Sequence, residues 1–126
     1  MKARIAPTLP TALCYRVGED VKAILHAQEI AVKEILPQEL GSDVGSFLGR
    51  GRTRTAEPES VPEESLLLMA DFSRAQMNRL LDALRTAQAH VDFKAVLTPT
   101  NRDWSVTDLI KELAQERAAI QGRVES

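Results

Sequence analysis

The chain has little of the chemistry on which most metal and catalytic sites depend. Its 126 residues include one cysteine, Cys14, and two histidines, His26 and His90. A single cysteine rules out an intramolecular disulfide and a four-cysteine metal site. Cys14 lies in an apolar run, where we expect a small core residue. Each histidine lies near the end of a predicted helix, where a protonated imidazole is mildly favourable. We therefore expect no metal site and no catalytic residue.

Aromatic residues and excess positive charge are also scarce. Aromatics make up 4% of the chain, so leucine, isoleucine, valine and alanine have to build the core. The net charge of -2 lacks the basic excess that free-standing nucleic-acid-binding proteins usually show. No apolar run reaches the length of a membrane span, and the N-terminus lacks the sustained apolar segment of a secretion signal. We expect a cytoplasmic protein with neither membrane nor nucleic acid as a partner.

Apolar periodicity predicts an alternation of strands and helices. The predicted strands cover residues 12–17, 30–36, 65–70 and 91–97. The predicted helices, which carry apolar residues on one stripe, cover residues 19–28, 42–48, 74–88 and 106–120. Ser73 with Gln76 forms a capping-box pattern at the start of one helix, and Ser105 can cap the last helix.

This order of elements predicts an α/β fold made of two βαβα units that form one four-stranded sheet with packed helices. The first unit covers residues 1–48 and the second covers 65–126. Residues 49–64 contain glycines, prolines and charged residues, which is the composition of a flexible linker. Arginines 50, 52 and 54 in it are better explained as solvated than as contacts to nucleic-acid phosphate. Each unit alone is marginal in size for a core, so we expect one joint globular domain.

The two units also share an order of apolar residues. An alignment pairs Leu13 with Met69, and Val44, Phe47 and Leu48 with Val106, Leu109 and Ile110. Two unrelated βαβα units would align in this way by pattern alone, so an internal duplication and a coincidence both stay open. A duplication predicts that a pseudo-twofold axis relates the units and that they share a core.

The most distinctive segment, residues 97–105, follows a predicted strand and precedes a predicted helix. Ligands often bind α/β sheets at such loops, and helix N-termini favour anions. Helix capping does not account for four polar residues of this loop, Thr98, Thr100, Asn101 and Arg102. We predict them as a site for a phosphate or carboxylate, without a cofactor, because no glycine-rich phosphate-binding motif is present. The structural alternative, which we favour, is a strand stop at Pro99, a turn and a core plug at Trp104.

One part of this segment follows a recognisable pattern. The run from Lys94 to Trp104, Lys-Ala-Val-Leu-Thr-Pro-Thr-Asn-Arg-Asp-Trp, resembles the Lys-Ala-Val-x-Thr-Pro-x-Asn-x-x-Trp pattern of a bacterial family of small proteins of unknown function. The resemblance covers about residues 65–117. Asp71 stands where the family usually has glycine before Phe72, which suggests a slightly different turn. The resemblance supports the fold and implies no activity, cofactor or catalytic residue.

Two functional hypotheses follow. The leading one is a small, non-enzymatic interaction or regulatory module with a protein partner or a second copy of itself. The alternative is a small-ligand or nucleotide-binding domain that uses the Thr98–Trp104 loop to hold an anionic ligand.

Overall fold

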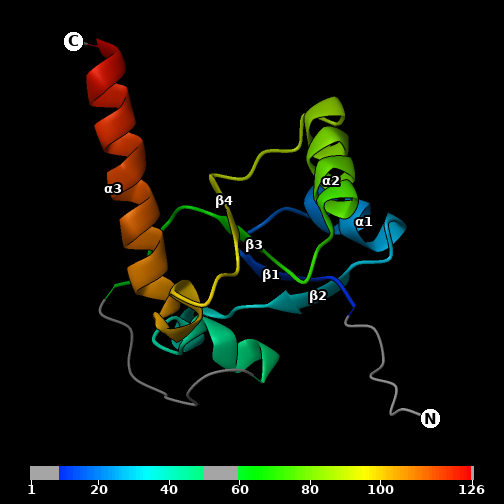
Figure 1. Ribbon diagram of the computed structural model, residues 1–126, viewed down its shortest axis with the longest axis horizontal. Helices are drawn as coiled ribbons and strands as arrows, with labels where there is room; N and C mark the ends of the chain where they lie inside the picture. Colours follow the sequence, from blue (N-terminus) through cyan, green and yellow to red (C-terminus); the bar gives the residue numbers. More distant parts are fainter. Residues whose placement is uncertain (1–8, 50–59, 126) are drawn as a thin grey trace.

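A four-stranded mixed sheet forms the centre of the computed structural model, which describes residues 9–49 and 60–125. The strands are β1 (Thr11–Tyr15), β2 (Ala31–Glu34), β3 (Leu66–Ala70) and β4 (Phe93–Val96). They lie in the order β2-β1-β3-β4 (Figure 1). Strand β1 is parallel to β2, β3 is parallel to β4, and the central pair β1–β3 is antiparallel. The predicted α/β class and the four-stranded sheet are confirmed, while most of the predicted linker lies outside the described residues.

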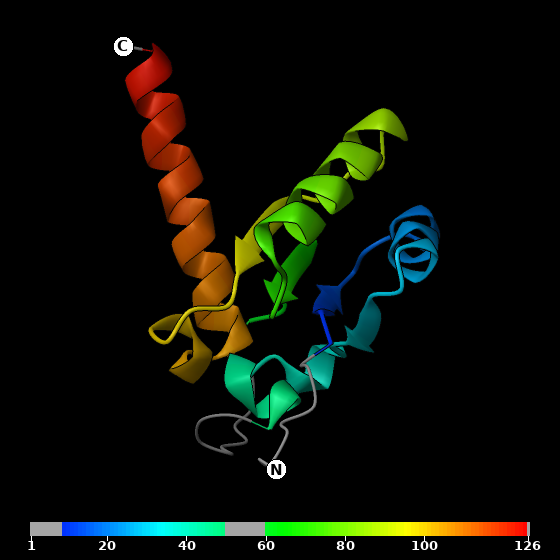
Figure 2. The same cartoon turned by 45° about the vertical axis from the view of Figure 1, so that its right-hand side comes forward.

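Helices cover both faces of this sheet. Helices α1 (Glu19–Ala27) and α2 (Arg74–Thr86) lie on one side, and α3 (Val106–Glu125) lies on the other (Figure 2). The α1/α2 side buries a cluster that includes Cys14, Leu25 and Leu84, and the α3 side buries one that includes Leu13 and Phe93. Each cluster draws on both halves of the chain. Among the described helices, none has the length and apolar character needed to cross a membrane.

The helix predicted at residues 42–48 is wrong as an α-helix. The chain there forms a short 3-10 helix, η2 (Val44–Leu48), and ends it at Gly49, whose φ of 71° is left-handed. Gly45 lies inside this element, and glycine is an unfavourable residue in a helix interior. Two further 3-10 helices, η1 (Pro37–Glu39) and η3 (Asn101–Asp103), follow the edge strands β2 and β4. The first unit therefore has no counterpart to the long helix α3.

Two antiparallel pairings join equivalent segments of the two units. In the antiparallel β1–β3 register, Leu13 lies opposite Leu68. On the α3 side, Asp43 and Ser105 form an antiparallel bridge that flanks η2 and α3. Its two hydrogen bonds are exchanged, since Val44 N–H donates to the Trp104 carbonyl at 2.8 Å and Val106 N–H donates to the carbonyl of Ser42 at 3.2 Å. In this register the counterpart of Leu13 is Leu68, one residue before Met69, with which the sequence alignment pairs it.

The helix ends repeat the same backbone geometry in both units. After α1, Glu29 has a φ of 60°, and Ile30 N–H donates to the Leu25 carbonyl at 3.0 Å. After α2, Gln88 has a φ of 56°, and the N–H of residue 89 donates to the Leu84 carbonyl at 2.9 Å. Both ends are Schellman motifs, in which a left-handed residue closes the helix. A common ancestor of the two units nevertheless stays a prediction.

Left-handed residues also follow the two central strands. Arg16 after β1 has a φ of 58°, and Asp71 after β3 has a φ of 65°. Glycine adopts this conformation without steric cost, whereas aspartate is among the residues that tolerate it. The left-handed φ of Asp71 is a conformation in which glycine would also fit, as expected from the sequence.

Replacing a left-handed residue by glycine should stabilise the protein. We expect Gln88→Gly to raise the free energy of unfolding by about 1 kcal/mol, because it removes the β-carbon clash at this φ. Gln88→Ala is the control, since alanine keeps the β-carbon and should give no gain. Urea denaturation monitored by circular dichroism measures both. A loss of stability in Gln88→Gly would contradict the assignment.

Candidate functional site

The loop after β4 is held in shape by two of the four residues predicted as a ligand site. Thr98 N–H donates to Asn101 Oδ1 at 2.9 Å, and Asn101 N–H donates to Thr98 Oγ1 at 3.0 Å. The Asn101 amide nitrogen also donates to the Val96 carbonyl at 3.0 Å, and Asn101 is only 8% exposed. The side chains of Thr98 and Asn101 therefore have a structural task, which is to cap the turn that leads into η3.

The equivalent loop of the first unit uses the same device. After β2, Leu36 N–H donates to Glu39 Oε1 at 2.9 Å, across Pro37. In the second unit, Pro99 takes the place of Pro37 between the capped N–H group and the side chain that accepts from it. In both turns, the accepting side chain lies three residues after the N–H group that it caps. The pattern explains Asn101 without a ligand.

The predicted ligand residues do not all come together. A cavity of about 170 Å³ lies at the carboxyl ends of β3 and β4, lined by Asp71, Leu97, Thr98, Pro99 and Arg102. Thr98 and Arg102 therefore share a cavity with the carboxylate of Asp71, while Thr100 is exposed and Asn101 is buried within the turn. This volume is below the roughly 300 Å³ at which pockets for drug-sized ligands begin. Its lining includes one acidic residue, Asp71, and one basic residue, Arg102.

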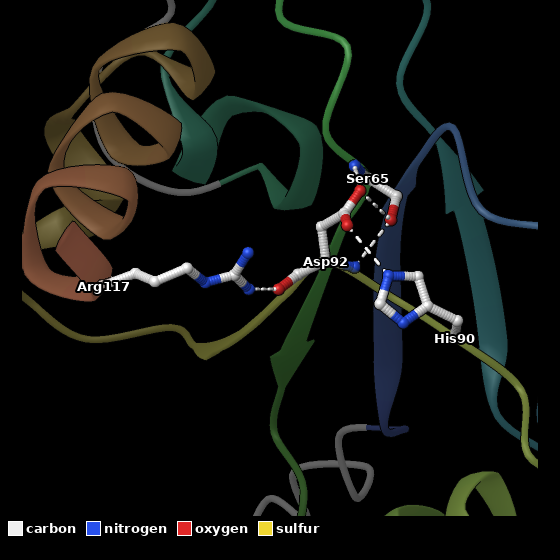
Figure 3. A network of polar contacts seen from close by, with 4 residues as sticks. All are labelled: Ser65, His90, Asp92 and Arg117. Atoms are coloured by element: carbon white, nitrogen blue, oxygen red, sulfur yellow. Dashed lines mark hydrogen bonds and ion pairs between the residues drawn. The ribbon is translucent and has the colours of Figure 1, made fainter. Parts of the chain in front are cut away.

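Serine, histidine and aspartate meet at the opposite end of β4, but not as a catalytic triad (Figure 3). Asp92 Oδ2 accepts from Ser65 N–H at 2.8 Å and from Ser65 Oγ at 3.2 Å, while His90 Nε2 lies 2.9 Å from Asp92 Oδ1. A triad needs the histidine to bond the serine hydroxyl. Here both residues bond the aspartate instead. Hydrogen bonds from the Ser65 backbone and from His90 lower the pKa of Asp92, so it stays ionised and clamps the starts of β3 and β4 together.

Arg117 fastens helix α3 to the same end of β4. Its guanidinium donates to the carbonyl of Asp92 (Figure 3). The guanidinium carbon also lies 4.3 Å from the centre of the Phe93 ring. A cation over an aromatic face is attracted by the ring quadrupole. Beyond this contact the helix leaves the sheet, and Ile120 is 55% exposed. Arg117 therefore marks the end of the packed part of α3.

Cys14 is buried between the sheet and α1. Burial raises the pKa of its thiol to about 12. Because the thiolate is the reactive form, this thiol is a poor nucleophile at neutral pH. In residues 9–49 and 60–125, no three histidine, cysteine, aspartate or glutamate side chains gather as ligands for a metal.

An apolar groove runs between helix α2 and the edge strand β4. It encloses about 370 Å³ and is lined by Leu81, Leu84, Ala89, Arg85 and Lys94. Leucine and alanine side chains form its floor, while Arg85 and Lys94 are exposed at its rim. Arg85 forms an ion pair with Asp82 one turn earlier on α2. The rim thus has a cation on the helix and another on the strand.

Val96 extends this apolar surface along β4. Phe93 and Ala95 pack into the cluster on the α3 side. Alternation along a strand therefore places Lys94 and Val96 on the α2 side. Val96 is 41% exposed. Because Val96 lies on the same face of β4 as Lys94, two residues further along, we group it with the lining residues under the name α2–β4 groove: Leu81, Leu84, Arg85, Ala89, Lys94 and Val96.

The first unit closes the corresponding surface with an ion pair. Lys22 on α1 pairs with Glu34 on β2, and the lysine side chain is 20% exposed. Counting from the matching helix ends and strand registers, Lys22 corresponds to Leu81 and Glu34 to Val96. The same backbone arrangement therefore has an ion pair between helix and strand in the first unit and an open apolar groove in the second.

Sequence reasoning missed this groove. Its signal was the pattern on β4, where Lys94 and Val96 share a face that alternation assigns to the helix side. The sequence does not show that β4 is an edge strand, and edge position is what leaves Val96 exposed. The comparison with Lys22 and Glu34 also required the structural alignment of the two units.

We expect Asn101 to matter for stability and Arg102 to matter little. Asn101→Ala should lower the free energy of unfolding by about 1–3 kcal/mol, because it leaves the buried hydrogen-bonding groups of the turn unpaired. Arg102→Ala, at the exposed neighbouring position, is the control and should stay within about 0.5 kcal/mol of the wild type. Urea denaturation of the two variants checks this. Equal stabilities would show that the cap contributes nothing.

Comparison with known proteins finds one similarity, which lies in the second half of the chain. Residues 65–120 match the family model described as "Domain of unknown function (DUF3783)". The match covers β3, α2, β4 and the packed part of α3, and so includes the α2–β4 groove and the capped loop. No curated protein and no solved structure matches the chain. Residues 65–120 of this chain are thus similar to a domain whose function is not known.

Proposed function

We propose that this protein is a small, non-enzymatic interaction module that binds a protein partner through the α2–β4 groove. The observation that carries the proposal is the open apolar strip at Leu81 and Val96, in the place where the first unit has the Lys22–Glu34 ion pair. Arg85 and Lys94 add positive charge at the rim of this apolar strip. Apolar surface with a charged rim is typical of protein interaction sites.

The groove also has the rigidity that a docking surface needs. Its helix starts at a complete capping box, in which Ser73 and Gln76 bond each other's backbone N–H groups, as the sequence predicted. Its strand is fixed at one end by the Asp92–Ser65 bonds and at the other by Asn101. A partner that binds here loses little free energy to ordering the protein, which favours affinity.

Transferring the ion pair of the first unit to the second should abolish partner binding. We expect Leu81→Lys combined with Val96→Glu to close the groove and to remain folded, because the same pair is accommodated at Lys22 and Glu34. The full chain and the variant are each used to capture partners from an extract of the source organism, with mass spectrometry as the readout. Proteins retained by the wild type should be lost from the variant.

A matched control keeps the net charge constant. Lys22→Leu combined with Glu34→Val removes one positive and one negative charge at the corresponding positions of the first unit, and it should retain the partners of the wild type. Circular dichroism confirms folding of both variants. If no protein is captured by the wild type, or if the closed groove captures the same set, the interaction proposal fails.

The second candidate is a binding site for a small anion at the loop after β4. The cavity lined by Asp71, Leu97, Thr98, Pro99 and Arg102 supports it, since Arg102 offers a cation at the carboxyl ends of two parallel strands. Trp104 is the one tryptophan of the chain and follows η3 directly. We expect inorganic phosphate or a nucleotide to change the fluorescence of Trp104, and Arg102→Ala to remove the change. No response to any of a panel of phosphorylated compounds would exclude this candidate.

Three expectations from the sequence remain part of this proposal. They are an origin of the two units by internal duplication, a flexible linker over residues 49–64 and a bacterial, cytoplasmic protein. The repeated Schellman motifs and the exchanged bonds of the Asp43–Ser105 bridge support the first of them.

A further inference from the structure

The outer edge of β4 presents a short row of backbone groups to solvent. On the inner side, Phe93 N–H donates to the Ser65 carbonyl at 3.0 Å, and Leu97 N–H donates to the Met69 carbonyl at 2.9 Å. Alternate residues of a parallel strand bond to the same neighbour, so the N–H and C=O groups of Lys94 and Val96 point away from β3. Because β4 is the last strand of the sheet, no strand among the described residues pairs with these groups.

The row is limited at both ends by side chains. At one end, the Asn101 amide donates to the carbonyl of Val96. At the other end, the Arg117 guanidinium donates to the Asp92 carbonyl, and Asp92 N–H donates to Ser65 Oγ at 2.8 Å. Within residues 9–49 and 60–125, this leaves the N–H and C=O of Lys94 and the N–H of Val96 without a partner strand. They define a docking window centred on Lys94.

We propose that a partner protein inserts an extended, acidic segment along this window, so that it adds to β4 as a fifth strand and lays its apolar side chains in the α2–β4 groove. The inference rests on the proposed function and names the kind of partner segment that the groove takes. Addition of a strand to an open sheet edge supplies affinity through main-chain hydrogen bonds, and pockets for alternate side chains supply specificity. The window and the groove provide these two parts on the same strand.

The positive charge of Lys94 favours a partner segment that contains acidic residues. Lys94 forms no ion pair among the described residues, and this exposed residue lines the groove. The side chain of an added strand directly opposite Lys94 would lie on the same face, about 5 Å away between β-carbons. A carboxylate there would pair with Lys94. The next residues on that face, two positions along in either direction, would meet the apolar floor and Val96.

The other possible occupants fit less well. A second copy that pairs β4 with β4 about the window centre would place two Lys94 ammonium groups opposite each other, which is destabilising. At the edge of β2, the Lys22–Glu34 ion pair takes the positions that Leu81 and Val96 hold beside β4. Charged residues on edge strands commonly prevent strand addition. On β4 this charge is Lys94 alone, and a carboxylate opposite it would neutralise the charge, whereas the Lys94 of a second copy would not.

A library of random ten-residue peptides displayed on phage tests the inference on the full chain. We expect selection to enrich peptides in which apolar and acidic residues alternate, and amide hydrogen exchange at Lys94 and Val96 to slow when a synthetic copy of such a peptide is bound. Proline at the peptide position opposite Lys94 removes the N–H that the added strand needs, and should weaken binding at least about tenfold. Enrichment of peptides with helical apolar spacing would overturn strand addition.

Charge reversal gives the specificity control. Lys94→Glu should bind the acidic peptide at least about tenfold less tightly and should bind a peptide with lysine in place of its acidic residues more tightly than the wild type does. Unchanged affinity for both peptides would reject the charge assignment. The closed-groove variant, Leu81→Lys with Val96→Glu, should bind neither peptide.

The failure of this inference can be told from failure of the proposed function. If the groove captures a partner but the selected peptides have helical spacing, or no peptide is selected, strand addition is refuted. The interaction module would still stand in that case. Analytical ultracentrifugation covers the remaining occupant. A wild-type dimer that the closed-groove variant converts to a monomer would show that a second copy fills the groove, which contradicts the partner segment.

Discussion

The antiparallel pairing of β1 with β3 is the constraint on which the rest of the structure depends. Leu13 lies opposite Leu68 at the centre of the sheet, and both residues are fully buried. Because each of these strands is also parallel to the next strand of its own unit, the pairing sends β2 and β4 to the two edges. It also brings α1 and α2 to one face, which leaves the other face to the 3-10 helices and α3 (Figure 2).

The same pairing explains why the two loops after the edge strands meet. Each loop crosses the α3-side face toward the centre, where Asp43 and Ser105 form their bridge. From this point the units diverge, since the first continues into η2 and stops at Gly49, whereas the second continues into the 20 residues of α3. Glycine lowers helix propensity in the first case, and Ser105 caps the helix in the second, accepting from Asp108 N–H at 3.1 Å.

Side chains, and not the backbone, make the two edges different. Lys22 and Glu34 join helix to strand in the first unit, and Leu81 and Val96 leave the corresponding space open in the second. The polar loop at Thr98 and Asn101 illustrates the converse. Its residue types resemble those of a ligand site, yet the two side chains cap a turn that the first unit closes with Glu39. Polar composition at a strand end is therefore weaker support for a site than exposed apolar area at an edge.

The sequence by itself determined the alternation of strands and helices, the capped start of α2 and the burial of Cys14, because these depend on local spacing and on apolar runs. It predicted an α-helix at residues 42–48 where the chain forms η2, since apolar spacing there outweighed two glycines. The tertiary structure decided which strands lie at the edges, and that order cannot be deduced from periodicity. Because β4 is an edge strand, Val96 is exposed and not part of the core. Asn101, which the sequence suggests as a ligand-binding residue, caps the turn and donates a hydrogen bond to the Val96 carbonyl. Whether a side chain is available for binding thus depends on neighbours that are distant in the sequence.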